Sequence, residues 1–281
     1  MITAKPQILR QDGVTKGYQP LKIGERSIAA AYLPQSLGKS RGAVLLLHDI
    51  NEHIDSAAIG ILRRQLPAHG WDTLAIKIIR FGEDAAPQAT TENEETQVAS
   101  DDATVDADNQ AADSATPEDT AAENNEIPAE AEVPIAQAET FTVITTAQRI
   151  DAALAKLQQE GHDNIVLVGQ GTGGQLALKT ISETAVPIAA LIMINAGEID
   201  GETNILDSTI PTLEIVGSRQ KDSVKDAALT RQTQMKTEQR TNYQLRQIAG
   251  ADHYFSSTVQ ALTNQVHGWL FKQLFDEEAS R

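Results

Sequence analysis

Glycines near the middle of the chain stand where a hydrolase would place its nucleophile. Residues 165–174 read Ile-Val-Leu-Val-Gly-Gln-Gly-Thr-Gly-Gly, an apolar run followed by closely spaced glycines. A nucleophile elbow is a buried strand, a Gly-x-Ser-x-Gly turn and a helix, in which the central Ser attacks the substrate. Gly169 and Gly173 take the flanking positions, so the central position is Gly171. Because glycine has no side chain, this frame closes the usual acyl-enzyme route.

Shifting the frame by one residue makes Thr172 the alternative nucleophile. That frame puts the long side chain of Gln170 at a position that must be small, so we expect Gly171 at the tip of the turn. An empty tip would leave backbone N–H groups at the start of a helix free to hold a carboxylate, phosphate or sulfate. The simpler alternative is that the tight turn needs its glycines for conformational reasons alone.

Composition limits the remaining possibilities. The 281 residues suffice for one large α/β domain or two ordinary ones, and with only 4% aromatic residues the core must consist of Leu, Ile, Val and Ala. The chain has no Cys, which excludes disulfides, thiolate nucleophiles and Cys-based zinc sites. No stretch approaches the roughly 20 apolar residues of a membrane span. We expect no membrane span and no nucleic-acid partner.

The net charge of −16 comes from one segment. Residues 83–139 carry 17 of the 39 Asp and Glu and lie in a stretch without Lys or Arg, so the rest of the chain is nearly neutral. The segment lacks Gly, Leu and aromatic residues, and such a composition predicts a disordered insertion. An acidic arm is the functional alternative. Such an arm would bind either a basic partner or the chain's own polar helix, which carries Lys225, Arg231, Lys236 and Arg240. The alternative for that helix is a face exposed to solvent.

Outside the insertion, strand and helix patterns alternate, which predicts a doubly wound, mostly parallel α/β sheet. A hairpin is expected from strands at 21–23 and 28–33. Later strands are expected at 43–47, 71–79, 165–168, 188–194, 212–216 and 243–248. Helices are expected around 59–66, after Thr145 or Thr146, at 175–184, at about 223–239, and around 259–274. We expect one domain made of residues 1–82 and 141–281, interrupted by the insertion at 83–140.

The order of these parts resembles the α/β-hydrolase fold. Three runs, Gly42 to His48, Leu62 to Ile76 and Gly161 to Leu167, also resemble an uncharacterised family of bacterial α/β-hydrolase-like proteins in which Gly replaces the nucleophile. Members of that family usually begin with a secretion signal. The resemblance therefore implies an envelope-associated, periplasmic protein seen here without its signal; a cytoplasmic protein is the alternative.

The resemblance places the other catalytic groups late in the chain. In Gly250-Ala251-Asp252-His253-Tyr254-Phe255, His253 takes the position of the general base. Without a nucleophile it can at most activate water, and a structural histidine is the alternative. Asp222 is the nearest candidate for the acid, although it could instead cap a helix that starts at Ser223. The oxyanion hole is also doubtful, because Asp49 follows His48 where active relatives have Gly.

A metal site is a further hypothesis. Residues 48–55 hold two His, two Asp and one Glu at the end of a strand, so His48, Asp49 and His53 could bind zinc together with His253. The spacing matches no established metal motif, and we expect neither metal nor cofactor.

We interpret the sequence as a monomeric, catalytically impaired α/β-hydrolase-like protein that binds a small molecule or a protein. The alternatives are an unconventional hydrolase, using Thr172 or water activated by His253 or a metal, and a scaffold with a filled pocket. The candidate ligand-binding residues are His48, Asp49, Gly169, Gln170, Thr172 and Gly173.

Overall fold

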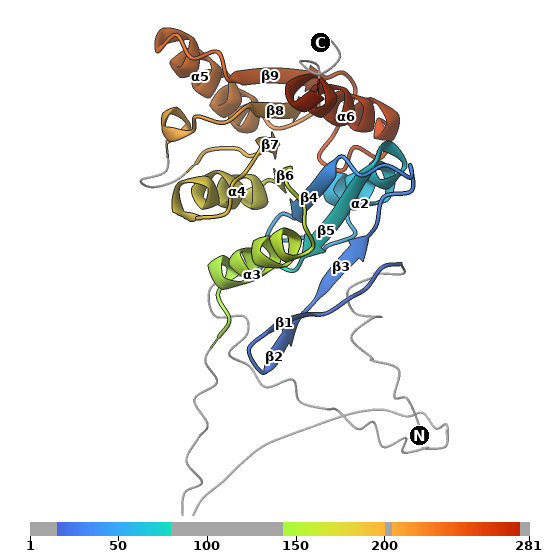
Figure 1. Cartoon of the computed structure of the whole chain (residues 1–281). Helices are drawn as coiled ribbons and strands as arrows, with labels where there is room; N and C mark the ends of the chain where they lie inside the picture. The colour runs from blue at the N-terminus through green and yellow to red at the C-terminus, as the bar shows by residue number, and fades with distance from the viewer. Residues whose placement is uncertain (1–15, 80–142, 200–203, 276–281) are drawn as a thin grey trace, which may run out of the picture. The chain divides into compact units, whose positions relative to one another are not determined.

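A computed structural model describes residues 16–79, 143–199 and 204–275. The insertion expected at 83–140 lies wholly outside these ranges. In the described part, strands and helices alternate from β4 onward, and a seven-stranded sheet has the order β3-β5-β4-β6-β7-β8-β9 (Figure 1). Every neighbouring pair in this sheet is parallel except β3 with β5.

The N-terminal strands differ in one respect from the expected hairpin. β1 (Leu21–Ile23) pairs with β2 (Arg26–Ile28) across a two-residue turn, whereas β3 (Ala30–Leu33) leaves that hairpin and pairs antiparallel with β5 in the main sheet. The expectation of one strand over 28–33 was therefore wrong. The apolar pattern of the sequence does not show where β2 ends and β3 begins, because the residues on both sides of this break are apolar.

The central strands are apolar because the sheet is covered on both faces. β4 (Gly42–Leu47), β5 (Trp71–Ile76) and β6 (Ile165–Gln170) are buried along their whole length. β7 (Ala190–Ile194) and β8 (Thr212–Gly217) are buried as well, and β9 (Tyr243–Ile248) forms one edge of the sheet.

Two layers of helices cover this sheet. α2 (Ala57–Gln65) and α6 (Val259–Phe275) pack on one face through Ile59, Leu62 and Trp269. α3 (Thr146–Gln159), α4 (Thr172–Glu183) and α5 (Asp222–Thr237) pack on the other face through residues such as Leu154 and Met235. Two 3-10 turns complete the elements of the described residues: η1 (Leu66–His69), which ends at Gly70 with φ 87°, and η3 (Ile205–Asp207). In the described part, no helix combines the length and the apolarity that a bilayer crossing needs.

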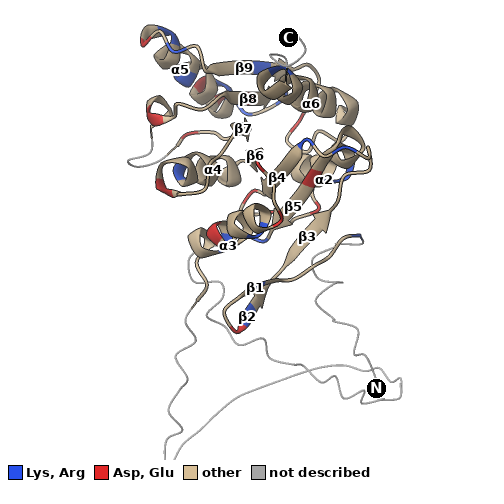
Figure 2. Ribbon diagram, in the orientation of Figure 1, with Lys and Arg blue, Asp and Glu red and all other residues tan. Residues whose placement is uncertain are grey.

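Helix α5 corrects one expectation about charge. Arg231 does not lie on a solvated basic face: it is 6% exposed and donates from Nε to Glu214 Oε2 at 2.9 Å in the middle of β8. The Tyr243 hydroxyl donates to the same carboxylate oxygen at 2.5 Å. Burial by itself lowers the pKa of Arg231, but the hydrogen bond and the charge of Glu214 outweigh it and raise that pKa. The cation is needed to compensate a carboxylate in an otherwise apolar strand. Figure 2 shows that charges of both signs are spread over the described elements.

Candidate functional site

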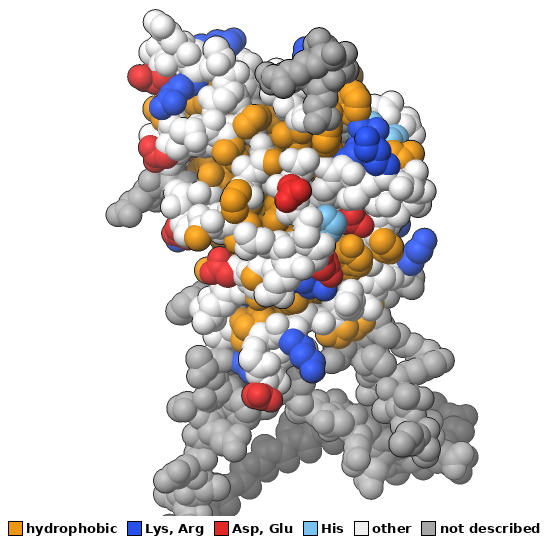
Figure 3. Space-filling view, viewed as in Figure 1, with side chains coloured by type: hydrophobic (Ala, Val, Ile, Leu, Met, Phe, Trp, Pro, Cys, Tyr) orange, Lys and Arg blue, Asp and Glu red, His pale blue; other side chains and the backbone are white. Residues whose placement is uncertain are grey.

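The carboxyl ends of β4 and β6 and the loop after β9 bring several of the candidate residues together. Parallel strands end at the same edge of the sheet, and ligands of doubly wound folds bind at that edge. His48 and Asp49 follow β4, Gly171 follows β6, and His253 lies between β9 and α6. Near the middle of the face seen in Figure 3, a histidine and acidic side chains lie close together, with hydrophobic side chains around them.

Gly171 occupies the tip of the turn between β6 and α4. Its backbone has φ 53° and ψ −123°, a conformation that residues with side chains rarely adopt, and it precedes the first residue of α4. Its N–H donates to the carbonyl of Ile194 at 2.9 Å, which fixes the tip against β7. The strand, strained turn and helix are the backbone of a nucleophile elbow, with glycine at the central position.

The flanking glycines are required by close backbone contacts. A Cβ on Gly169 would lie 2.1 Å from the carbonyl oxygen of Gly173, and a Cβ on Gly173 would lie 2.3 Å from the carbonyl oxygen of Leu47. Real Cβ atoms do not approach backbone so closely, so neither position accepts a larger residue without rearrangement of the turn. The expected conformational role of these glycines therefore has a direct steric cause.

The carboxylate of Asp49 fills the space above Gly171. A Cβ added to Gly171 would lie 2.1 Å from Asp49 Oδ2 and 2.4 Å from Asp49 Cγ. The volume that a nucleophilic side chain would use is thus taken by an acidic side chain from the loop that follows the neighbouring strand β4. A serine at position 171 and the present position of Asp49 are mutually exclusive.

Asp49 also accepts hydrogen bonds from the two backbone groups that would form an oxyanion hole. Its Oδ1 accepts from the N–H of Ile50 at 2.7 Å and, at the longer distance of 3.4 Å, from the N–H of Thr172. In an active elbow, the hole consists of the N–H after the nucleophile and an N–H from the loop after the equivalent of β4. The two donors are present here, but a negative side chain occupies them, so they are not open to a substrate oxygen.

His253 is held by side chains from two other loops. Its Nε2 donates to Glu52 Oε1 at 2.8 Å, and its Nδ1 lies 3.1 Å from Gln220 Nε2. The hydrogen bond to Glu52 is the largest cause that raises the pKa of His253; it outweighs burial, and the charges of Glu52, Asp49 and Asp252 act in the same direction. In the neutral ring Nδ1 accepts from the Gln220 amide, whereas protonation requires that amide to turn and present its oxygen. A carboxylate thus takes the ring nitrogen that would have faced the nucleophile.

Gln170 links the elbow to this histidine. Its buried side chain donates from Nε2 to the carbonyl oxygen of His253 at 2.9 Å, and its Oε1 accepts from the N–H of Ala58 at 2.9 Å. The second bond satisfies an N–H in the first turn of α2, which has no partner within the helix. The long side chain before the tip therefore fastens β6 to α2 and to the loop that carries His253.

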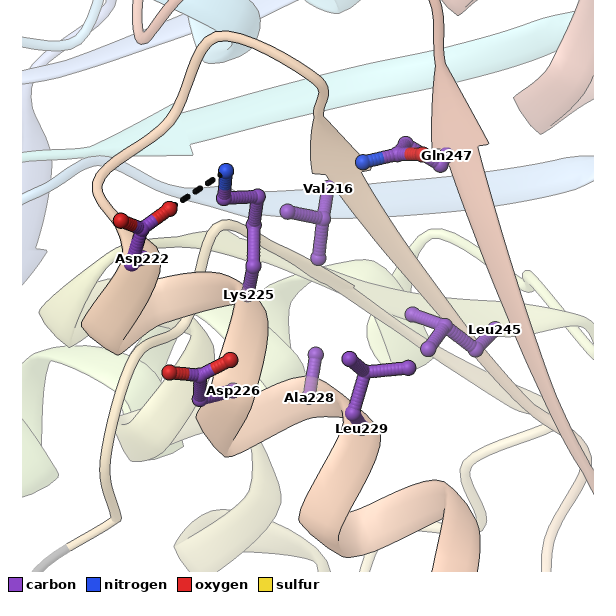
Figure 4. Close-up of a pocket in the computed structure, with 8 residues that line it drawn as sticks. All are labelled: Val216, Asp222, Lys225, Asp226, Ala228, Leu229, Leu245 and Gln247. Carbon is purple, nitrogen blue, oxygen red and sulfur yellow. Dashed lines mark ion pairs between the residues drawn. The ribbon is translucent and has the colours of Figure 1, made fainter.

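Asp222 makes no hydrogen bond with His253 among the described residues. It is the first residue of α5, its side chain is 89% exposed, and it pairs with Lys225 at 2.7 Å (Figure 4). That hydrogen bond, with the charge of Lys225, lowers the pKa of Asp222. Gln220, two residues earlier, is the side chain that contacts the Nδ1 of His253. Asp222 instead lines a groove of about 290 Å³ between α5 and the ends of β8 and β9.

The two histidines considered for a metal have other roles. His48 is 1% exposed; its Nε2 accepts from the N–H of Ile78 at 3.1 Å, so its Nδ1 carries the proton and donates to the carbonyl of Asp49 at 2.6 Å. Burial is the main cause that lowers the pKa of His48, which keeps the ring neutral. His53 is exposed, and its Nδ1 accepts from the N–H of Asp55 at 3.3 Å. Within residues 16–79, 143–199 and 204–275, no group of three His, Cys, Asp or Glu side chains could hold a metal ion.

Thr172 is the first residue of α4 and lies beside Asp49 rather than beside a base. Its N–H points at Asp49 Oδ1, and in the described part of the chain no imidazole takes a hydrogen bond from its hydroxyl. The structure thus brings Asp49, Gly171, Thr172 and His253 to one edge of the sheet, and leaves Asp222 and His53 outside this group.

Sequence reasoning did not identify two residues of this site. Glu52 is 201 positions from its partner His253, and Gln220 is 33 positions away. A signal existed for Glu52, because an acidic residue close after a strand that ends at the catalytic edge is a natural partner for a histidine. No signal existed for Gln220, since a glutamine in a polar loop is unremarkable.

Comparison with solved structures identifies the class of fold. The chain is similar to the protein of unknown function ATU1826 from Agrobacterium tumefaciens, with a TM-score of 0.60 and 14% identity over 92% of this chain and 97% of that one. Est1E from Butyrivibrio proteoclasticus gives a TM-score of 0.56 and 14% identity over 92% and 99% of the two chains. XC6422 from Xanthomonas campestris, an α/β serine hydrolase without a lid, gives a TM-score of 0.54 and 13% identity over 91% of this chain and 92% of that one. The expected α/β-hydrolase-like fold is confirmed.

The particular family follows from the sequence. The profile described as "Protein of unknown function (DUF3530)" matches residues 3–272, so the chain belongs to the DUF3530 family. A search of curated proteins finds no match. The protein is therefore an α/β-hydrolase-like member of a family of unknown function.

Proposed function

We propose that this protein acts by binding, without the hydrolytic chemistry of its fold. The observation that carries the proposal is the position of Asp49, whose carboxylate fills the space of the missing nucleophile and occupies the N–H groups of Ile50 and Thr172. An acyl-transfer site needs both a nucleophile and a vacant oxyanion hole. With neither available, the edge of the sheet that normally carries out catalysis remains as a surface for a ligand or a protein. A scaffold whose site is closed by its own side chains is a variant of the same proposal.

The test is a combination of turnover and covalent labelling. We expect the wild-type protein to show no turnover of p-nitrophenyl esters, thioesters or amides, and no adduct with a fluorophosphonate by intact mass. Gly171→Ser should also remain unlabelled, because Asp49 blocks the new side chain and its oxyanion hole. Ester turnover that His253→Gln abolishes, or a fluorophosphonate adduct on Thr172 that Thr172→Val removes, would overturn the proposal.

One observation favours an alternative, a hydrolase that uses water directly. His253 is a third exposed and is paired with Glu52, an arrangement that can hold and polarise water. This alternative predicts slow turnover with a pH dependence set by His253 and no covalent adduct. Measurement of hydrolysis in wild type and in Glu52→Gln separates it from binding alone, since only the alternative predicts a change.

We also propose a location in the bacterial envelope, which the family resemblance supports through the secretion signals of its members. Fractionation of a bacterium that expresses the full-length gene would test this, and recovery with the cytoplasmic fraction would contradict it.

A further inference from the structure

The acidic side chains of the site reverse the charge that an elbow normally offers to a ligand. In a working elbow, free backbone N–H groups and a helix N-terminus attract an anion. Here the N–H groups of Ile50 and Thr172 already point at Asp49. Glu52 adds a second carboxylate, and Asp252 a third, around the single imidazole of His253. Negative groups therefore outnumber positive ones even when His253 is protonated.

One carboxylate oxygen in this group has no partner. Glu52 Oε1 bonds to His253, but Glu52 Oε2 is buried and accepts no hydrogen bond within the described part of the chain. The Glu52 side chain is only 9% exposed. A buried, unpartnered carboxylate oxygen is costly, and its presence beside a functional edge calls for a donor. Since it is an acceptor only, the missing partner must bring N–H or O–H groups.

An aromatic ring lies at the outer side of the same group. Tyr254 is 58% exposed and contacts His253 edge to face, with ring centroids 5.2 Å apart. It follows Asp252, whose Oδ1 accepts from the N–H groups of Tyr254 and Phe255 at 3.0 Å and 2.9 Å and so fixes the turn. An exposed aromatic face beside carboxylates is suited to an organic cation, which gains cation–π attraction there.

We propose that this site binds the ammonium group of a small organic amine. The inference rests on the proposed binding function. The ammonium group donates to Glu52 Oε2 and to Asp49 Oδ2, the atom above Gly171, while its carbon chain lies along Tyr254. Anions, including the carboxylate and phosphate ligands that the glycine turn suggests in the sequence, are repelled by Asp49 and Glu52.

The experiment is an NMR titration of the uniformly ¹⁵N-labelled full chain with n-butylammonium, 1-butanol and butyrate. These probes share a four-carbon chain and differ in charge. We expect n-butylammonium at millimolar concentrations to shift the amide resonances of Thr172, His253 and Tyr254, and butyrate and butanol to leave them unchanged. Equal shifts with butyrate, or no shift with n-butylammonium, would overturn the proposal.

Variants connect the binding to the named atoms. Glu52→Gln should weaken n-butylammonium about tenfold, the loss expected for one charge-assisted hydrogen bond. Asp49→Asn provides a second variant if Glu52→Gln does not fold, and is expected to weaken binding by a similar factor. Glu183→Gln on α4 is the matched control, because that carboxylate is 56% exposed and its ion pair, with Lys179, lies on the same helix. Binding that is unchanged in both site variants contradicts the proposed contacts.

The outcome of this titration can be distinguished from the outcome of the turnover test of the proposed function. If the wild-type protein hydrolyses esters yet binds n-butylammonium in the site, the binding-only function is wrong and the ammonium site stands. If it neither hydrolyses esters nor binds the amine, the ammonium site is wrong and a binding function for another ligand stands.

Discussion

A side chain placed on Gly171 should destabilise the protein in two separable ways, through backbone strain and through displacement of the Asp49 carboxylate. The backbone at φ 53° and ψ −123° costs about 1–2 kcal/mol for any residue with a Cβ. The new Cβ would also lie 2.1 Å from Asp49 Oδ2 and must displace that carboxylate from the N–H of Ile50. A charge-assisted hydrogen bond of this kind contributes about 1.5–2 kcal/mol, the lower part of the usual range, because Asp49 is only half-buried.

These terms predict a non-additive double-mutant cycle. Gly171→Ala should lower the free energy of unfolding by about 3 kcal/mol, and Asp49→Ala by about 1.5–2 kcal/mol. In the double variant the contact with Asp49 can be lost only once, so we expect about 3 kcal/mol rather than the additive 5 kcal/mol. Urea unfolding monitored by tryptophan fluorescence measures all four proteins, provided that their m-values agree.

A matched control isolates the backbone term. Gly24 has φ 61° and no atom within 4 Å of a Cβ placed on it, so Gly24→Ala should cost about 1 kcal/mol and be additive with Asp49→Ala. Additive effects of Gly171→Ala and Asp49→Ala would refute the claim that Asp49 occupies the space above the turn.

Three further outcomes are expected from the buried polar groups. The hydrogen bond to Glu52 raises the pKa of His253. The stability that this bond contributes is therefore fully present below the ordinary histidine pKa of about 6.5 and is lost as the pH rises through the pKa of His253 in the folded protein. Glu52→Gln should lower the NMR-measured pKa of His253, and an unchanged value would contradict the contact. Burial lowers the pKa of His48, so ¹⁵N shifts of its ring should show the neutral form with the proton on Nδ1 at pH 7, and a protonated ring there would be inconsistent with the bond from Ile78. Arg231→Met should destabilise the fold by about 3–5 kcal/mol because it leaves Glu214 as a buried, unpaired charge; thermal unfolding measures this, and a loss below 1 kcal/mol would indicate that Glu214 finds another partner.

The parts of the fold that local sequence patterns determine could be predicted. The apolar runs of β4, β6 and β7 specify buried strands, and the spacing of Gly169, Gly171 and Gly173 specifies a tight turn before a helix. These features depend on neighbours within a few residues, which the sequence displays directly. The break at Ala29 between β2 and β3 could not be predicted, because it depends on pairing with β5 more than 40 residues later.

The contacts of the site were less accessible to sequence reasoning. The sequence indicated that Asp49 would impair an oxyanion hole. Its position over Gly171, however, depends on one side-chain rotamer and on the pairing of β4 with β6, which brings Asp49 to Thr172 across 123 positions of the chain. Gln220 rather than Asp222 reaches His253, since α5 begins at Asp222 and carries that side chain into solvent. Arg231 could have been placed correctly, because the lone Glu214 within an apolar strand requires a cation nearby.

The proposed binding function depends most directly on the carboxylate of Asp49, which occupies the N–H groups of Ile50 and Thr172. NMR measures that contact directly: in the wild-type protein the two amide protons should resonate downfield and exchange slowly with solvent, and in Asp49→Ala they should move upfield and exchange faster. Amide protons of Ile50 and Thr172 with the same shifts and exchange rates in the wild-type protein and in Asp49→Ala would contradict the occupied site.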